Sequence, residues 1–113
     1  MSEGNVLANL IAELRRGTQI ISVLSQLQKN QYGYSLLQDL QKMDMNIEAG
    51  TLYPLMRRLE SQNILQSEWD TSDSRPRKYY ILSPMGRDVL IELKKEWYKL
   101  ASEMEQIFEE EIK

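Results

Sequence analysis

The sequence predicts a mainly α-helical fold with a small β-hairpin and a long C-terminal helix. Apolar residues recur at helical spacing through the first 62 residues, and branched and aromatic residues flank a polar loop between residues 64 and 82. After Gly86 neither glycine nor proline interrupts the chain. With 113 residues, we expect one domain, or one small domain with an appendage.

Helical segments are expected before the hairpin. Asn5 can cap a helix over residues 5–16, whose apolar residues form a single stripe. Gly17 interrupts this helix, and apolar-periodic segments follow at residues 20–27, 32–43 and 50–62. The stripe of the first helix consists of Val6, Leu7, Leu10, Ile11 and Leu14.

Two strands joined by a polar loop are expected next. Residues 64–69 change to a strand-like pattern, and residues 70–76, DTSDSRP, are dense in turn formers. Residues 78–82, KYYIL, are typical of a returning strand. Alternation along this strand puts Tyr79 and Tyr80 on opposite faces, so one is expected in the core and the other exposed or at an interface.

A long helix is predicted from Ser83-Pro84 to about Ile112, with Ser83 as N-cap and Pro84 at the first helical position. Its apolar residues alternate by three and four, which is the pattern of a coiled-coil seam. We therefore expect a dimerisation helix, while packing back on the core of its own chain stays an alternative. The seam consists of Leu90, Leu93, Trp97, Leu100, Met104 and Ile107.

The composition excludes several kinds of site. The chain has no cysteine and no histidine, which excludes disulfides, Cys or His zinc sites, Cys nucleophiles and His general bases. No paired constellation of other residues suggests catalysis, so we expect no enzyme, no metal and no cofactor. No apolar run approaches the ~20 residues of a membrane span, and no signal-peptide pattern is present, so a cytoplasmic protein without membrane contact is expected.

The charge is distributed unevenly. The net charge is −3, yet five basic residues face four acidic ones between residues 57 and 78, and eight acidic residues face four basic ones from residue 88 onward. A local basic face on an acidic chain is compatible with DNA binding, because the affinity for DNA depends on the electrostatic potential at the contact surface and not on the net charge. Ordinary solvated arginines are the alternative.

The expected order of elements is that of a winged helix-turn-helix. In that architecture the helix before the wing enters the major groove, while the wing loop reaches the phosphate backbone or the minor groove. We therefore expect a DNA-binding domain over residues 1–83 and a C-terminal dimerisation helix over residues 84–113.

Several segments carry a specific resemblance. YGYSLL at residues 32–37, GTLYPLMRRLE at 50–60, Trp69 at the end of the first strand, and RPRKYYILSPMG at 75–86 resemble the PadR family of bacterial transcriptional regulators. The resemblance covers roughly residues 17–107. It implies a homodimeric winged helix protein, usually a repressor, whose C-terminal helices dimerise. Asn63 stands where many members have glycine, and asparagine tolerates the left-handed conformation that helix ends often need.

Eight residues are candidates for DNA contact, from the two helices of the helix-turn-helix and the wing. Thr51 and Tyr53 begin the expected recognition helix, and Arg57 lies one turn further, within reach of a guanine or a phosphate. A half-buried core position is the alternative for Tyr53. The candidates are Tyr34, Ser35, Thr51, Tyr53, Arg57, Arg75, Arg77 and Lys78.

Pro54 interrupts the expected recognition helix near its start. If this helix begins at Gly50 or Thr51, Pro54 lies within or at the edge of the first turn, where a missing N–H costs little. If the helix begins near Asn46, Pro54 must kink it.

Trp97 is a candidate for effector binding or for a dimer groove. The resemblance implies that, in some members, planar or drug-like molecules bind between the terminal helices and the DNA-binding domains, and aromatic walls suit stacking. Filling the dimer core is the alternative role of Trp97.

The leading expectation is a dimeric repressor that reads a palindromic operator and responds to a small planar or hydrophobic effector. Two other functions stay open: a winged helix used purely for protein interaction, and a drug-binding protein centred on Trp97 without direct operator binding.

Overall fold

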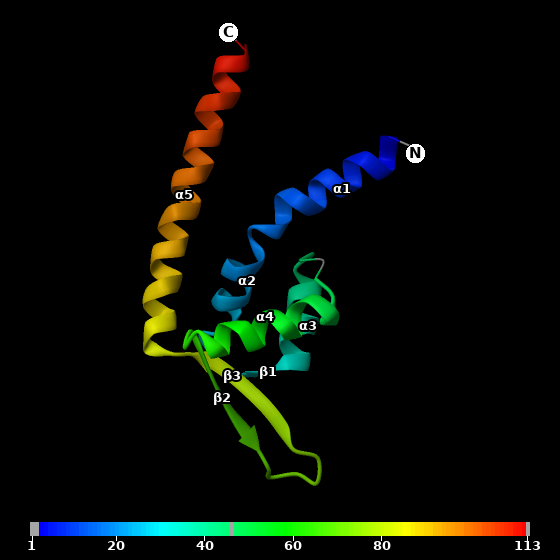
Figure 1. Ribbon diagram of the computed structural model, residues 1–113, viewed down its shortest axis with the longest axis vertical. Coiled ribbons are helices and arrows are strands. Elements are labelled where there is room, and N and C mark those ends of the chain that lie inside the picture. The colour runs from blue at the N-terminus through cyan, green and yellow to red at the C-terminus, as the bar shows by residue number, and fades with distance from the viewer. Residues whose placement is uncertain (1–2, 46, 113) are drawn as a thin grey trace.

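The elements follow the order expected from the sequence, with one added strand. The structure is a computed structural model that describes residues 3–45 and 47–112, and it is mainly helical with a small antiparallel sheet (Figure 1). The predicted fold class is therefore confirmed. The elements are α1 (Glu3–Arg16), α2 (Gln19–Gln26), β1 (Gln31–Tyr32), α3 (Gly33–Lys42), α4 (Ala49–Ser61), β2 (Leu65–Asp70), β3 (Arg77–Leu82) and α5 (Pro84–Ile112).

The hydrophobic core lies among α2, α3 and α4, and the ends of the strands and the start of α5 close it. Each of the three helices contributes the residues that share one face at helical spacing, which is why the apolar periodicity predicted them. The buried side chains are Val23, Leu24, Leu27, Leu36, Leu37, Leu40, Ile47, Leu52, Leu55, Met56, Leu59, Leu65, Leu82 and Leu90.

The sheet has three antiparallel strands in the order β1-β3-β2. β2 and β3 form the expected hairpin, the wing, which extends away from the helices in Figure 1. The short β1 was not predicted; it pairs Gln31 with Tyr80 and Tyr32 with Tyr79. Tyr80 packs against the core, whereas Tyr79 lies on the other face against the Tyr32 ring, so the predicted alternation is confirmed.

The turn from α4 into β2 depends on Asn63. This residue has a φ of 68°, in the left-handed region that asparagine tolerates. Its N–H donates to the Glu60 carbonyl at 3.0 Å, and the Ile64 N–H donates to the Leu59 carbonyl at 2.9 Å. This pair of bonds is the Schellman arrangement, which satisfies carbonyls left over at the helix end.

The start of α5 is locked onto the same turn. As predicted, Ser83 caps the helix: its Oγ accepts a hydrogen bond from the Gly86 N–H at 2.9 Å and donates to the Asn63 carbonyl at 2.6 Å. The Ser83 N–H donates to the Ile64 carbonyl at 2.9 Å. The position of Gly86 has no room for a side chain, because a Cβ there would lie 2.1 Å from the Ile64 carbonyl oxygen.

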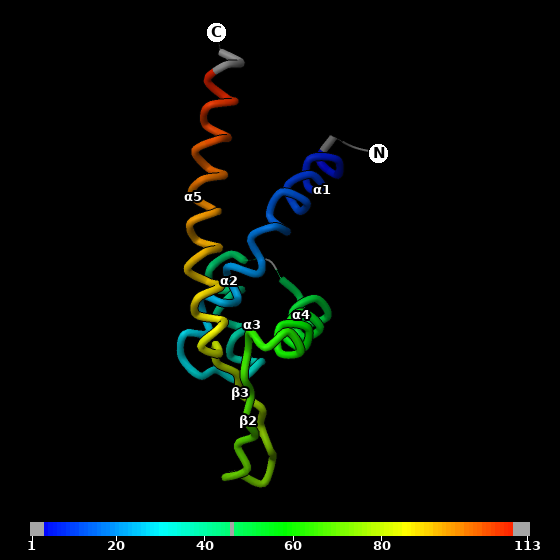
Figure 2. Tube along the Cα trace, turned by 60° about the vertical axis from the view of Figure 1, so that its left-hand side comes forward, coloured from blue at the N-terminus to red at the C-terminus, as the bar shows by residue number. Residues whose placement is uncertain are grey.

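Two helices project from the core. α1 and α5 extend from the side opposite the wing in both views (Figures 1 and 2). α1 begins at Glu3 rather than at 5, so Asn5 lies within the helix and is not its cap. The whole apolar stripe of α1 is exposed. Among the described residues, no helix combines the length and the apolar character needed to cross a membrane.

The first turns of α5 belong to the core of their own chain. Leu90 is only 3% exposed and Leu93 packs against the core, so the expected dimer seam is wrong at Leu90 and only partly exposed at Leu93. The physical reason is that α5 packs along α2 before it leaves the domain. The rest of the seam, namely Trp97, Leu100, Met104 and Ile107, is exposed.

Pro54 lies further into α4 than expected. Glu48 is the N-cap, and the first i to i−4 bond runs from the Leu52 N–H to the Glu48 carbonyl at 2.9 Å. Pro54 is thus the sixth helical residue, beyond the first turn, and the Gly50 carbonyl loses its usual donor. Pro54 and Gly50 are exposed, so water can satisfy that carbonyl.

The Gly86 contact gives a stability prediction. Gly86→Ala should lower the free energy of unfolding by about 2 kcal/mol, because the added methyl group must displace backbone rather than a flexible side chain. Gly50→Ala is the matched control, since a Cβ there meets nothing within 4 Å, and it should be neutral or stabilising. Urea denaturation at equal protein concentration measures both; equal stability of the two variants would contradict the close contact.

Candidate nucleic-acid interface

The outward face of α4 carries the polar residues predicted from the sequence. Thr51, Pro54 and Arg57 are exposed, and their spacing of three residues places them on one stripe. The opposite stripe, which packs in the core, consists of Leu52, Leu55, Met56 and Leu59. The apolar residues therefore hold the helix down while the polar ones face solvent.

Tyr53 lies between these two stripes. It is half-buried and packs against the core, as the alternative interpretation expected. A Cβ on Gly33 would lie 3.2 Å from its ring, so the absence of a side chain at Gly33 lets the start of α3 approach α4 closely. Among the described residues, no hydrogen bond involves the Tyr53 hydroxyl.

The two candidates at the start of α3 differ in accessibility. Tyr34 is 66% exposed. Ser35 is half-buried, and its hydroxyl donates to the Tyr32 carbonyl at 3.0 Å and contacts the Gln31 side chain at 3.3 Å. Ser35 therefore stabilises the first turn of α3, and Tyr34 is the residue of this pair that faces solvent.

The loop end of the wing carries exposed arginines beside a cluster of hydrogen bonds centred on Asp70. Arg75 and Arg77 are exposed, and the Arg77 guanidinium lies 5.3 Å from the centre of the Tyr32 ring. The Tyr32 hydroxyl donates to Asp70 Oδ2 at 2.7 Å. Asp70 Oδ1 also accepts from the Ser72 hydroxyl at 2.6 Å and from the Ser72 N–H at 3.0 Å.

These bonds shift the pKa values of Asp70 and Tyr32. The hydrogen bond from the Ser72 hydroxyl, followed by those from Tyr32 and the Ser72 N–H, lowers the pKa of Asp70 from 3.8 to about 2. The same Asp70 bond is the main cause of a raised pKa at Tyr32. Asp70 is thus an anion held by neutral donors, which links the wing loop to the end of β1.

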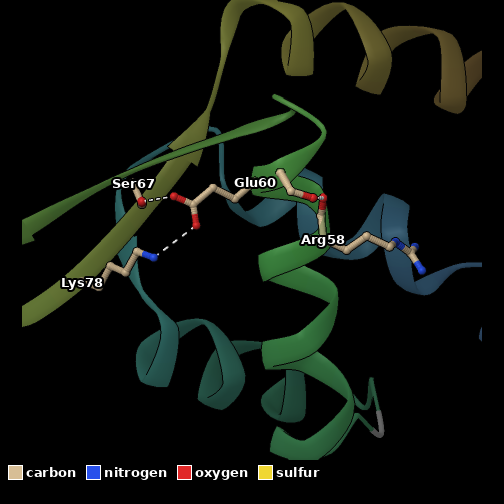
Figure 3. Close-up of polar contacts among 5 residues, drawn as sticks. Arg58, Glu60, Ser67 and Lys78 are labelled. Carbon is tan, nitrogen blue, oxygen red and sulfur yellow. Dashed lines mark hydrogen bonds and ion pairs between the residues drawn. The ribbon is translucent and has the colours of Figure 1, made fainter.

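Lys78 differs from the wing arginines because it is paired. Its Nζ lies 3.1 Å from Glu60 Oε1, and Glu60 Oε2 accepts a hydrogen bond from the Ser67 hydroxyl (Figure 3). The Ser67 bond, followed by Lys78, lowers the pKa of Glu60, and Glu60 is the main cause of the raised pKa of Lys78. Figure 3 shows the Arg58 side chain pointing away from this cluster.

Trp97 lines an apolar groove of about 400 Å³ between α2, α4 and α5. Ile20 and Ile21 of α2, and Leu93 and Leu100 of α5, line the same groove, together with Arg58 at the end of α4. The groove lies on the side of the molecule where α5 leaves the core, away from the wing. The candidate residues thus fall into two separate regions.

Three residues in these regions were missed as functional candidates. Tyr32 and Glu60 carry the hydrogen bonds that hold the wing, and their partners lie far away in the sequence. Trp69 is 62% exposed and stands opposite Lys78 in the β2–β3 register. The sequence contained a signal for Trp69, namely a large aromatic side chain on a strand of the wing. Such side chains can stack on sugars and bases, so Trp69 could have been named as a candidate for DNA contact. In the described part of the chain, no cluster of three or more potential ligands can hold a metal ion.

The helix-turn-helix, the exposed polar stripe on its second helix and the adjoining hairpin together define a winged helix DNA-binding protein. Residues 20–92 match the sequence model of the transcriptional regulator PadR-like family, which is more than half of the chain. The chain belongs to the PadR-like family of transcriptional regulators.

Known relatives agree with this assignment. The transcriptional regulator Rv3488 of Mycobacterium tuberculosis is 33% identical over 93 residues, which cover 81% of this chain and 87% of that protein. The crystal structure of a PadR family transcriptional regulator from Eggerthella lenta is 46% identical, with a TM-score of 0.89 over 93% of this chain and 94% of that one. A PadR-like transcription factor from Bacteroides fragilis is 33% identical, with a TM-score of 0.74 over 88% and 98%.

The bonds at Asp70 predict a dependence of stability on pH. A carboxyl group whose folded-state pKa is depressed stabilises the fold above its unfolded pKa and loses this effect as the pH falls through the folded value. Asp70→Asn should therefore be less stable than the wild type at neutral pH, and the difference should shrink between pH 3.8 and about 2.

Thermal unfolding across this pH range measures the difference. Asp73→Asn is the matched control, because its carboxylate takes no part in the Tyr32 and Ser72 bonds. A difference between wild type and Asp70→Asn that is independent of pH would contradict the argument.

Proposed function

We propose that this protein is a dimeric repressor that binds a palindromic operator and responds to a small planar or hydrophobic effector. The observation that carries the proposal is the exposed stripe of Thr51 and Arg57 on α4, with the exposed Arg75 and Arg77 on the adjoining wing. Exposed donors on a helix that packs on the core suit the major groove, and exposed cations on a wing suit phosphates.

Each candidate has a proposed role that its exposure permits. Thr51 and Arg57 contact base edges, while Tyr34 and the Tyr53 hydroxyl donate to phosphates. Arg75 and Arg77 contact the backbone beside the groove. Ser35 supports the start of α3 and leaves DNA contact to its neighbour. The acidic net charge is no obstacle, because the acids concentrate in the C-terminal helix.

A second copy of the chain is the proposed occupant of the exposed apolar faces. The stripe of α1 and the outer seam of α5 lie on helices that leave the core on one side, and contiguous apolar surface of this kind marks an interface. The alternation of three and four residues along α5 supports helix–helix packing. A two-fold dimer would present two copies of α4 to a palindromic site.

The groove beside Trp97 is the proposed effector site. It touches α4 at Arg58 and Leu59 as well as α5 at Leu93 and Leu100, so a ligand there would contact both the recognition helix and the dimer helix. A ligand with different affinities for the bound and free arrangements would shift operator affinity. Such a repressor, bound to chromosomal DNA, would work in the cytoplasm.

DNA binding tests the proposal directly. Binding of a duplex from the promoter of its own operon should weaken with salt, each phosphate contact contributing about −0.9 to the slope of log K against log salt. Arg75→Ala should make the slope shallower by about 0.9. Arg57→Ala should cost about 1–3 kcal/mol and reduce the preference for operator over random duplex.

Fluorescence anisotropy across a salt series provides these values. Lys94→Ala is the control, since Lys94 is an exposed basic residue of α5 and lies outside the proposed DNA interface. Wild-type protein that binds operator and random duplex equally would refute the repressor proposal.

The dimer makes a separate prediction. Leu100→Asp should produce monomers at micromolar concentration in sedimentation velocity, because it places a charge in the apolar seam. Ser102→Asp introduces the same side chain on the opposite side of α5 and should remain dimeric. A Leu100→Asp protein that stays dimeric would show that α5 does not form the interface.

A further inference from the structure

We propose that Glu60 and Lys78 brace the wing against the recognition helix, and that Lys78 acts by positioning the wing and not by contacting phosphate. This inference rests on the proposed DNA binding and assigns Lys78 a role different from that of Arg75 and Arg77. Both members of the pair are positioning residues, because they act through the side chains that the wing presents.

The geometry places one carboxylate among three elements. Glu60 lies near the end of α4, and its two oxygens are divided between the strands of the wing: Oε1 pairs with Lys78 of β3, and Oε2 accepts from Ser67 of β2 (Figure 3). A carboxylate with both oxygens occupied in this way has one orientation. The end of the recognition helix is therefore fixed to both strands at once.

The strand register shows that Lys78 faces the helix. In β2 and β3, Ser67 stands opposite Tyr80 and Trp69 stands opposite Lys78, so these four side chains share the face of the sheet that looks toward α4. The Lys78 Nζ also lies 5.3 Å from the centre of the Tyr80 ring. Two attractive partners, the Glu60 carboxylate and the Tyr80 ring, thus hold the ammonium on the side of the wing that faces α4.

The other face of the wing has its own tie. The Tyr32 hydroxyl bonds to Asp70 there, at the end of β2. β1 pairs with β3 only at Tyr79 and Tyr80, so beyond these residues the wing is a two-stranded ribbon, which twists readily. A tie on one face leaves that part free to rotate about the tie, whereas ties on both faces fix its angle. Lys78 and Tyr32 together therefore determine where Arg75, Arg77 and Trp69 point.

Charge balance also opposes a phosphate contact. If Lys78 left Glu60 for a phosphate, the Glu60 carboxylate would remain uncompensated beside the DNA backbone, where like charges repel. In the pair, the two charges cancel. The side chains of the pair are about 30% exposed, and such pairs contribute little to folding stability, which leaves orientation as their main effect.

The two roles of Lys78 predict opposite effects of Glu60→Gln. If Lys78 contacts phosphate, Glu60→Gln frees the ammonium and removes a negative charge, so DNA binding should tighten. If the pair is a brace, Glu60→Gln should weaken binding despite the more favourable charge, by about two- to fivefold, the scale of one partly exposed ion pair. Lys78→Gln should weaken binding similarly, with a salt slope close to that of the wild type.

The experiment uses the full chain, with operator and random duplexes titrated across salt. Arg75→Ala is the reference for a lost phosphate contact, and Glu92→Gln, which breaks the exposed Glu92–Lys95 pair of α5, is the matched control. The exchanged pair Glu60→Lys with Lys78→Glu should recover part of the lost affinity, because it restores an ion pair at the same place.

Trp69 supplies a readout that does not need DNA. In a Trp97→Phe background Trp69 is the only tryptophan, and it stands beside Lys78 in the register. Glu60→Gln should shift its emission, while Glu92→Gln should not. An unchanged emission, tighter binding by Glu60→Gln, or a slope shallower by about 0.9 in Lys78→Gln would each overturn the brace. If the wild type binds operator and random duplex equally, the proposed function fails. The Trp69 emission then still tests whether the Glu60–Lys78 pair positions the wing.

Discussion

The backbone of Asn63 and Ile64 is the joint on which the rest of the structure depends. The left-handed conformation of Asn63 ends α4 and turns the chain into β2. The two carbonyls of this joint accept the hydroxyl and the amide of Ser83, which begins α5. The recognition helix, the wing and the long helix thus meet at two residues. The Glu60–Lys78 pair adjusts only the wing, whereas a change at the joint displaces all three parts.

Most of the fold could be predicted because its signals are local. Ser83 and Pro84 predict the start of α5, Asn63 indicates the end of α4, and the apolar spacing identifies the core face of each helix. β1 could not be predicted, since two residues carry no pattern and their pairing with β3 is decided by tertiary packing. α4 begins at Ala49, one residue before the expected start at Gly50, because Glu48 is the N-cap without a side-chain capping bond and no capping residue marks the position.

The candidate site was predictable where exposure follows from spacing, as for Thr51 and Arg57 on α4. It was less predictable where the partner of a side chain decides its role. Periodicity reveals that Leu90 lies on an apolar face, but not that α2 covers that face. A count of charges lists Lys78 among the basic residues of the wing, yet Glu60, eighteen residues away, holds its ammonium. Long-range pairing of this kind leaves no trace in local sequence.

The length of α5 gives the joint a mechanical consequence. The helix has 29 residues, so it is about 40 Å long, and only its first turns are fixed to the core. The direction of α5 is fixed where Gly86 lies close to the Ile64 carbonyl. In the proposed dimer, a tilt of a few degrees at this contact would move the far end by several ångströms and change the distance between the two recognition helices. Because half-sites lie about 34 Å apart, or multiples of this, the angle of α5 at Gly86 would contribute to the operator spacing that the proposed dimer accepts.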